Sequence, residues 1–378
     1  MTRTKLKKTL AAILTDFKPN ENLADPYGSA FAQLDTPLDL PPAHSIYLAF
    51  VTISNYPWSG RNEKVAWAIS VTFRGVALVL THRKFGFRIL VLPDESLQPE
   101  WSVALFDRLK RAAWITDALI EPVVKKQVEN GNVTIANRFG YFDDMYRYFR
   151  RATARSYKRK APGAKRLKHG GVLYQPLKYA RIADFQAAAM LDAYFGRLEH
   201  SLVLILPFTL MDLRKQGVPE FILLGWKEKF LQLFNPEMEP AARDVFQPLL
   251  KIKERYRNMI FHGGFDKELQ VLYLHMPGAG AVPATLSRAN SNDAVRFSVL
   301  PIGETSFKAI CSTLDRFDQF LFKSCSLAAG FAFISAGLDV AYDASTRQMY
   351  HAALADGAIE DLIEFIGRTQ DDAANMDW

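Results

Sequence analysis

Short apolar runs rich in β-branched and aromatic residues recur in the first part of the chain and predict β-strands. The expected strands are Ile46–Ser54, Val65–Phe73, Val76–Thr81, Phe87–Leu92 and the short Val133–Ala136. Apolar residues recur instead at helical spacing in the opening residues, in Glu100–Glu129 and from near Tyr141. Residues 1–150 are therefore expected to form an α+β domain built on an antiparallel sheet with helices.

The helical period dominates the rest of the chain, from residue 172 to residue 378. The expected helices are Asp184–Leu213, Glu220–Phe234, Ala241–Ile260 and Thr305–Ser324, with further helices up to Arg368. Leu269–His275 and Val295–Leu300 alternate like two strands, with the small-residue-rich Gly278–Asn292 between them. The pattern predicts an all-α bundle domain, residues 172–378, that carries a small β-hairpin insertion.

Composition narrows the class of protein. The 378 residues are 49% hydrophobic, which is enough for two or three packed domains. The longest apolar stretches are shorter than the roughly 20 residues that cross a bilayer, and the N-terminus has no convincing cleavage site. A cytoplasmic protein is expected. Cys311 and Cys325 would be about 21 Å apart on one straight helix, which favours two buried thiols over a disulfide.

Positive charge is concentrated between Met145 and Ala183, where twelve Lys or Arg occur without one Asp or Glu. The whole chain has 47 basic and 40 acidic residues, so without this segment it would be acidic. Tyrosines and a phenylalanine among the cations suit contact with phosphates and unstacked bases. The candidate nucleic-acid-binding residues are Arg147, Arg150, Arg151, Arg155, Lys158, Arg159, Lys160, Lys165, Arg166 and Lys168. Residues 151–171 are expected to be a basic linker between the domains, and a solvated linker that binds nothing remains the alternative.

Residues 254–264, Glu-Arg-Tyr-Arg-Asn-Met-Ile-Phe-His-Gly-Gly, combine a permanent cation, an amide and an imidazole near the predicted end of a helix. His262 can exchange a proton near neutral pH, because the ordinary pKa of histidine is about 6.5. Arg257 offers donors to phosphoryl oxygens, and Asn258 can orient the imidazole or bind the phosphate. This trio predicts cleavage of an RNA phosphodiester by its own 2′-hydroxyl, and no metal or cofactor is expected.

One copy of the helix makes a poor site, because Arg257 and His262 are separated by roughly 140° around an ideal α-helix. Two copies around a twofold axis would bring both side chains into a shared cleft, which predicts a homodimer. Glu199, on the first bundle helix, is a possible supporting residue that pairs with Arg257 or His262. Alternatively, Glu199 simply lies on the solvent-exposed face of that helix. The motif also has a non-catalytic interpretation, in which Arg257 is a solvated helix residue and His262 caps the C-terminus of the helix.

The segment Arg257–His262 resembles the signature of the HEPN superfamily, in which an arginine precedes a histidine by a few residues. The polar Asn258 and the glycine after His262 match as well. The resemblance implies a dimeric helical bundle and a metal-independent endoribonuclease with Arg257, Asn258 and His262 as catalytic residues. It also implies a toxin, abortive-infection or antiviral-defence setting, in which a regulatory protein or antitoxin is a possible partner.

Two other classes of function remain compatible with the sequence. The bundle is alternatively a non-catalytic module for binding or dimerisation, or the protein is a nucleic-acid-binding regulator that acts through its basic segment. The first domain lacks a phosphate loop, a zinc-type Cys or His spacing and a nucleophile elbow. It is expected to sense a signal or bind a partner.

Overall fold

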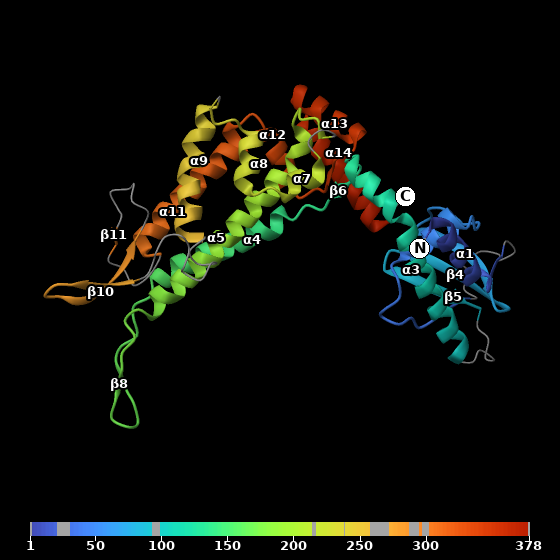
Figure 1. The fold of residues 1–378 in the computed structure, drawn as a ribbon, viewed down its shortest axis with the longest axis horizontal. Coiled ribbons are helices and arrows are strands. Elements are labelled where there is room, and N and C mark those ends of the chain that lie inside the picture. The colour runs from blue at the N-terminus through green and yellow to red at the C-terminus, as the bar shows by residue number, and fades with distance from the viewer. Residues whose placement is uncertain are drawn as a thin grey trace. The chain divides into compact units, whose positions relative to one another are not determined.

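The computed structural model describes residues 2–20, 31–92, 99–213, 217–237, 239–257, 272–286, 295–296 and 302–376. These residues form two compact units, one comprising 1–128 with 364–378 and the other 129–363 (Figure 1). Asn258, His262 and the two glycines after His262 lie outside the described residues. Arg257 is therefore the one member of the predicted catalytic trio whose surroundings can be given.

The first unit contains a five-stranded antiparallel sheet with the strand order β1-β3-β4-β5-β2. Its strands are β1 (Phe17–Pro19), β2 (Ala32–Gln33), β3 (Val65–Phe73), β4 (Val76–Arg83) and β5 (Gly86–Val91). Arg74 and Gly75 join β3 to β4 with positive φ angles of 49° and 87°, as a tight hairpin turn requires. The three predicted strands of this meander are confirmed.

Helices α1 (Arg3–Leu14) and α3 (Pro99–Glu129) share one hydrophobic core with the sheet. Phe17 packs edge-on against Phe50, with ring centres 5.1 Å apart, while Leu105 and Leu109 of α3 are completely buried. Both helices match the predicted ones. An antiparallel sheet packed against amphipathic helices thus gives the mixed α+β class that the sequence predicts.

The strand expected at Ile46–Ser54 is wrong, because this segment is helical. It forms α2 (Ala43–Tyr47) and a π-helical turn, η1 (Leu48–Ile53). Ile46, Ala49 and Phe50, spaced three and four apart, are fully buried and define a helical face. The β-branched residues of the segment suggested a strand, but burial follows the helical period.

The end of the chain returns to the first unit. The unit boundary falls within α14 (Ile359–Asn375), so its later turns belong with the sheet. Lys84 Nζ donates to Asn375 Oδ1 at 2.8 Å, and the Lys64 amide donates to the Met376 carbonyl at 3.1 Å. The predicted division into 1–150 and 172–378 does not include this return.

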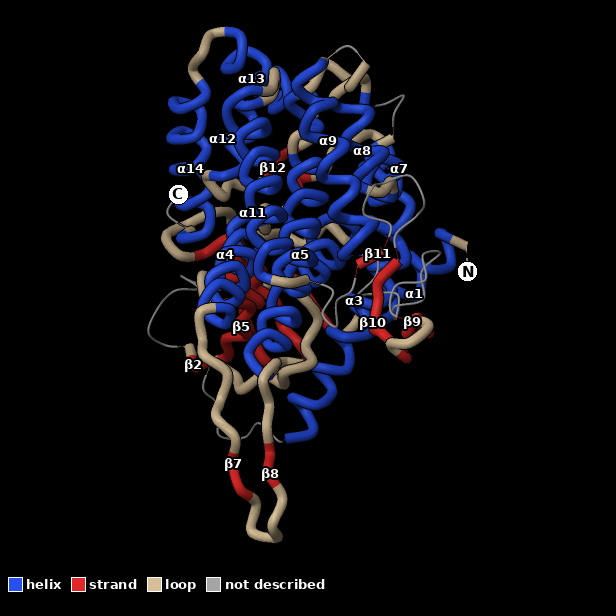
Figure 2. Tube along the Cα trace, turned by 90° about the vertical axis from the view of Figure 1, so that its left-hand side faces the viewer, coloured by secondary structure: helices blue, strands red, loops and turns tan. Residues whose placement is uncertain are grey.

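The second unit is a helical assembly organised around the antiparallel pair α4 (Phe139–Tyr157) and α5 (Lys178–Leu204) (Figure 2). Around this pair the described residues form α7 (Val218–Leu223), α8 (Trp226–Leu233), α9 (Pro240–Ile252), α11 (Glu304–Gln319), α12 (Ala328–Ser335) and α13 (Ala344–Ala355), among other helical segments. Phe230 is a centre of the aromatic core, stacked on Phe246 at 5.1 Å and tilted against Phe317 at 5.5 Å. The predicted helical C-terminal region is confirmed, although α4 belongs to it as well.

Several predicted elements change in extent. The expected helix Glu220–Phe234 is divided at Gly225 into α7 and α8. Helix α5 begins at Lys178, before its predicted first residue Asp184, which is buried and accepts a hydrogen bond from the Ile302 amide at 2.9 Å. Cys311 and Cys325 are buried free thiols, as predicted.

The insertion contains a three-stranded antiparallel sheet in place of the predicted two-stranded hairpin. Strand β10 (Gly280–Leu286) lies between β9 (Leu272–Met276) and β11 (Val295–Arg296). Gly278 and Gly280 have φ angles of 77° and 78°, which allow the reversal from β9 into β10. The segment expected to be a loop thus supplies the central strand.

Two short strands, β6 (Thr134–Ile135) and β12 (Val340–Ala341), pair within the second unit. Asn137 continues this connection, because its side-chain amide donates to the carbonyl oxygens of Ile334 and Leu338 at 2.8 and 3.0 Å. No helix in the described part of the chain is long and apolar enough to span a bilayer.

Candidate functional site

The helix that leads to the motif changes from α-helical to π-helical just before it. Helix α9 ends at Ile252 and continues as the π-helical turn η3 (Lys253–Arg257). Ala242, Phe246, Leu249, Ile252 and Tyr256 form one buried face that runs through both parts. This face fixes the turn against the core, and π-helical turns within helices occur frequently at functional sites.

Arg257 lies at the end of η3 and contacts Asp192 of α5. Its Nη2 atom is 3.3 Å from Asp192 Oδ1, and the Arg257 side chain is 34% exposed. An ion pair at this exposure retains contact with water, so Asp192 can orient the guanidinium while the group stays accessible to solvent. A planar, permanently charged group in such a position is suited to bind phosphoryl oxygens.

Glu199, the predicted supporting residue, lies two turns after Asp192 on α5 and binds a different cation. Glu199 Oε1 is 3.1 Å from Lys229 Nζ of α8. The Lys229 side chain is only 1% exposed and also donates to the carbonyl oxygens of Ile222 and Leu224. Glu199 thus neutralises the buried lysine that closes the α7–α8 junction, and Asp192 is the carboxylate at Arg257.

Lys253 adds a second cation one turn before Arg257. Its ammonium group lies 5.3 Å from the centre of the Trp226 ring, a cation–π distance. Burial lowers the pKa of Lys253, and the positive charge of Arg257 lowers it further, while Glu199, Glu228 and Glu254 oppose the shift. The three partly exposed cations of η3 therefore stand beside an exposed acid of the same turn, Glu254, and acids of α5 and α8 add to the balance.

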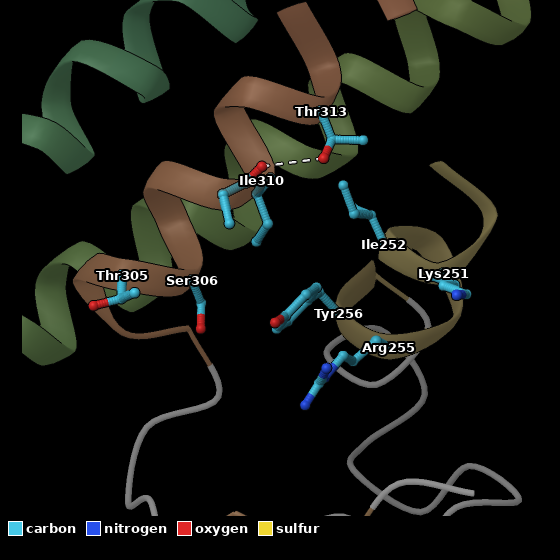
Figure 3. Close-up of a pocket in the computed structure, with 9 residues that line it drawn as sticks. Lys251, Ile252, Arg255, Tyr256, Thr305, Ser306, Ile310 and Thr313 are labelled. Carbon is cyan, nitrogen blue, oxygen red and sulfur yellow. Dashed lines mark hydrogen bonds between the residues drawn. The ribbon is translucent and has the colours of Figure 1, made fainter. Parts of the chain in front are cut away.

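A hollow of about 280 Å³ lies between η3 and α11 (Figure 3). Tyr256 points from η3 across this hollow, and Arg255 stands at its lower edge in the view. Arg255 Cζ is 5.6 Å from the Tyr256 ring centre, while Thr305 and Ser306 line the side formed by α11. The hollow thus combines a guanidinium from η3 with hydroxyl groups from the neighbouring helix.

The predicted nucleic-acid-binding residues fall into two groups. Arg147 pairs with Asp143 at 2.5 Å, and Arg150 makes a bidentate pair with Asp315 at 2.5 and 2.7 Å. The other eight are exposed at the end of α4 and on the loop that follows it. They are Arg151, Arg155, Lys158, Arg159, Lys160, Lys165, Arg166 and Lys168.

Residues 158–177, here called the arm, connect α4 to α5 within the second unit. The strands β7 (Lys165–Arg166) and β8 (Val172–Leu173) pair near its tip, and the arm projects from the helix pair (Figure 2). The segment predicted as an interdomain linker therefore lies inside one unit. Its cations are displayed on a hairpin at the end of two long helices.

A buried ion network that the sequence pattern does not predict crosses the helices of the second unit. Arg197 of α5 binds Asp318 of α11 through two hydrogen bonds of 2.5 and 2.6 Å and also binds Asp143 of α4. Tyr194 donates to Asp318 at 2.9 Å. Burial raises the pKa of Asp318, and Arg197 counteracts that rise.

This network lines a hollow of about 500 Å³ together with Phe139, Phe322 and Lys323. Its charges satisfy one another, so we assign it to the cohesion of the three helices. Within the described ranges, no three His, Cys, Asp or Glu side chains gather closely enough to hold a metal ion. A search of protein-family models, of curated proteins and of solved structures gives no match to this chain.

Proposed function

We propose that the protein is a metal-independent endoribonuclease of the HEPN type. The observation that carries the proposal is the partly exposed Arg257, held by Asp192 at the end of η3, where the Arg-Asn-Met-Ile-Phe-His segment begins. A surface rich in cationic donors next to a titratable imidazole is the equipment that phosphodiester cleavage requires. The cations Lys253 and Arg255 on the same turn support this assignment.

In the proposed reaction the 2′-hydroxyl of the RNA attacks the adjacent phosphorus. His262 acts as general base or acid, Arg257 stabilises the charge on the phosphorane oxygens, and Asn258 positions one of these groups. The leaving group is the 5′-oxygen of the next nucleotide, which receives a proton. The products carry a 2′,3′-cyclic phosphate or, after hydrolysis, a 3′-phosphate.

Arg257 and His262 are five residues apart in the sequence, which on an ideal α-helix corresponds to roughly 140° around the axis. A single copy of such a helix would not bring both side chains to one phosphate. We propose a homodimer in which two copies of this helix end share a cleft.

The proposed setting is a cytoplasmic toxin or antiphage-defence effector that a regulatory protein or antitoxin restrains. Its substrate is RNA, and no cofactor takes part in the proposed step. The first unit, with its separate core, is the proposed site of sensing or partner binding.

The test is incubation of the full chain with total RNA in EDTA, followed by analysis of product ends. The wild type is expected to leave cyclic or 3′-phosphate ends, and His262→Ala is expected to leave the RNA intact. His275→Ala, which changes an exposed histidine of β9, is the matched control and is expected to cleave normally. Equal cleavage by wild type and His262→Ala would contradict the proposal.

A second candidate is a nucleic-acid-binding regulator without cleavage, and the exposed cations of the arm favour it. A non-catalytic dimerisation module is the related alternative. Both predict intact RNA in every lane of the cleavage assay. RNA binding by an inactive protein would support the regulator, and a dimer that does not bind RNA would support the module.

A further inference from the structure

At the base of the arm, exposed aromatic rings and cations line one hollow of about 650 Å³. Its wall includes Tyr174, Pro176 and Leu177 from the arm and Lys178, Arg181 and Phe185 from α5. A volume of this size lies in the range of small-ligand sites. We call this feature the arm hollow.

The first two turns of α5 present one face to the arm hollow. Lys178, Arg181 and Phe185 are spaced three and four residues apart, so they lie on the same side of the helix. Phe185 and Tyr174 are each 63% exposed. Two large rings left this open at one place are unusual unless a partner covers them.

We propose that the arm hollow binds single-stranded RNA, with bases stacked on Tyr174 and Phe185 and phosphates on Lys178 and Arg181. Base stacking on aromatic side chains needs unstacked bases, which single strands supply and duplexes do not. Charge complementarity supports the same partner, because the arm and the helix ends beside it carry cations without one acid from residue 146 to residue 182.

This inference deepens the proposed nuclease function by naming a substrate-holding surface apart from Arg257. Arg159 and Lys178 also approach the Tyr179 ring, at 5.3 and 5.9 Å, which places two cations beside the first turn of α5. A strand held here would reach the nuclease site only if it is long enough or comes from the other subunit. Binding and cleavage are therefore separable measurements.

The probe is a fluorescent oligouridine of roughly 12 nucleotides with 2′-O-methyl groups, which the proposed reaction cannot cleave. Its affinity for the full chain is measured by fluorescence anisotropy. Tyr174→Ala and Phe185→Ala are each expected to weaken binding about 10-fold. Tyr141→Ala, at a tyrosine that is 64% exposed on the opposite end of α4, is the matched control and should leave affinity unchanged.

Conservative variants distinguish aromatic stacking on bases from non-specific hydrophobic contact. Phe185→Tyr keeps a ring and is expected to bind as well as wild type, whereas Phe185→Leu keeps an apolar side chain but should bind about as weakly as Phe185→Ala. Arg181→Gln removes one expected phosphate contact, so the negative slope of log affinity against log salt concentration should become shallower by about 0.7. Full binding by Phe185→Leu, or a duplex preferred over the single strand, would overturn the proposal.

Two other occupants are tested with the same proteins. The first is a membrane surface, tested by sedimentation with vesicles of phosphatidylserine and phosphatidylcholine. If Tyr174→Ala and Phe185→Ala reduce sedimentation with the vesicles but leave RNA affinity unchanged, the occupant is a membrane and the proposal is overturned. A changed oligomeric state without a changed RNA affinity would identify a second copy and overturn it equally. If wild type cleaves RNA and both alanine variants keep full affinity and cleavage, the arm-hollow proposal fails and the nuclease proposal stands. If the alanine variants lose binding but no form of the protein cleaves RNA, the arm-hollow proposal stands and the nuclease proposal fails.

Discussion

The Nη2 atom of Arg257 lies 3.3 Å from Oδ1 of Asp192, so a carboxylate of α5 directs the guanidinium at the end of η3. Asp192→Asn keeps the shape of the side chain but removes its charge. We expect RNA cleavage to slow about 10-fold, because the ion pair that orients Arg257 becomes a hydrogen bond from the guanidinium to an uncharged amide oxygen. The free energy of unfolding should change by less than about 1 kcal/mol, since the pair is exposed.

Single-turnover cleavage and urea denaturation of Asp192→Asn check this prediction. Asp39→Asn is the control, because it removes the charge of another exposed ion pair, with Lys110. A cleavage rate equal to that of Asp39→Asn would remove Asp192 from the site.

The buried network around Arg197 should contribute strongly to folding. Arg197→Met is expected to lower the free energy of unfolding by about 3–5 kcal/mol, because it leaves the largely buried carboxylate of Asp318 without the cation that binds it and leaves Asp143 with only the exposed Arg147. Adding Asp318→Asn should recover part of this loss. Arg147→Met, at an arginine on the exposed side of Asp143, should cost less than about 1 kcal/mol. Similar losses in the two methionine variants, measured by urea denaturation, would contradict the assignment.

His200 should make the stability of the second unit depend on pH. Its Nε2 atom accepts the Arg138 amide hydrogen at 2.9 Å, which requires a neutral ring. Burial lowers the pKa of His200 from 6.5, and the charge of Arg138 lowers it further. The unfolded chain therefore binds the proton more readily, so this stabilisation is complete above pH 6.5 and is lost as pH falls through the lowered value.

Urea midpoints measured between about pH 5 and pH 8 test this sign. His200→Gln can still accept the amide hydrogen without titrating, so its stability should change less over the range. The exposed His169→Gln serves as the control and should follow wild type. Parallel curves for wild type and His200→Gln would exclude His200 as the cause.

Two helical glycines should respond in opposite directions to alanine. A Cβ atom at Gly330 of α12 would approach Ile205 Cδ1 to 2.6 Å, whereas nothing lies within 4 Å at Gly140 of α4. Gly330→Ala is expected to destabilise by about 1–3 kcal/mol through overpacking. Gly140→Ala should stabilise by up to about 1 kcal/mol through helix propensity. Thermal denaturation of both variants checks the contrast, and a neutral Gly330→Ala would show that α12 can shift.

Local patterns predicted the elements whose causes are local. The hairpin from β3 to β4 follows from Arg74–Gly75, and α1 and α3 follow from apolar residues on one face. Ile46–Ser54 was assigned wrongly because its β-branched composition and its helical burial point in different directions, and burial depends on the tertiary partner.

Side-chain partners on distant helices were beyond the sequence pattern. Asp192 meets Arg257 from 65 residues away, and Arg197 meets Asp318 from 121 residues away. The motif identified Arg257 as a candidate, but the residue expected to support Arg257 or His262 was Glu199, two helical turns from Asp192. The sequence pattern also did not predict that the end of α14 belongs to the first unit, because this depends on contacts between residues far apart in the chain, such as Lys84 with Asn375.

The most direct test of the central claim compares two synthetic oligonucleotides of the same base order in EDTA. One is an RNA with all its 2′-hydroxyls, and the other has 2′-deoxy residues throughout. Attack by the substrate's own hydroxyl predicts that wild type cleaves only the first, that Arg257→Ala and His262→Ala cleave neither, and that the ends are 2′,3′-cyclic or 3′-phosphates. Cleavage of the deoxy strand, or 5′-phosphate ends from the ribose strand, would contradict the account.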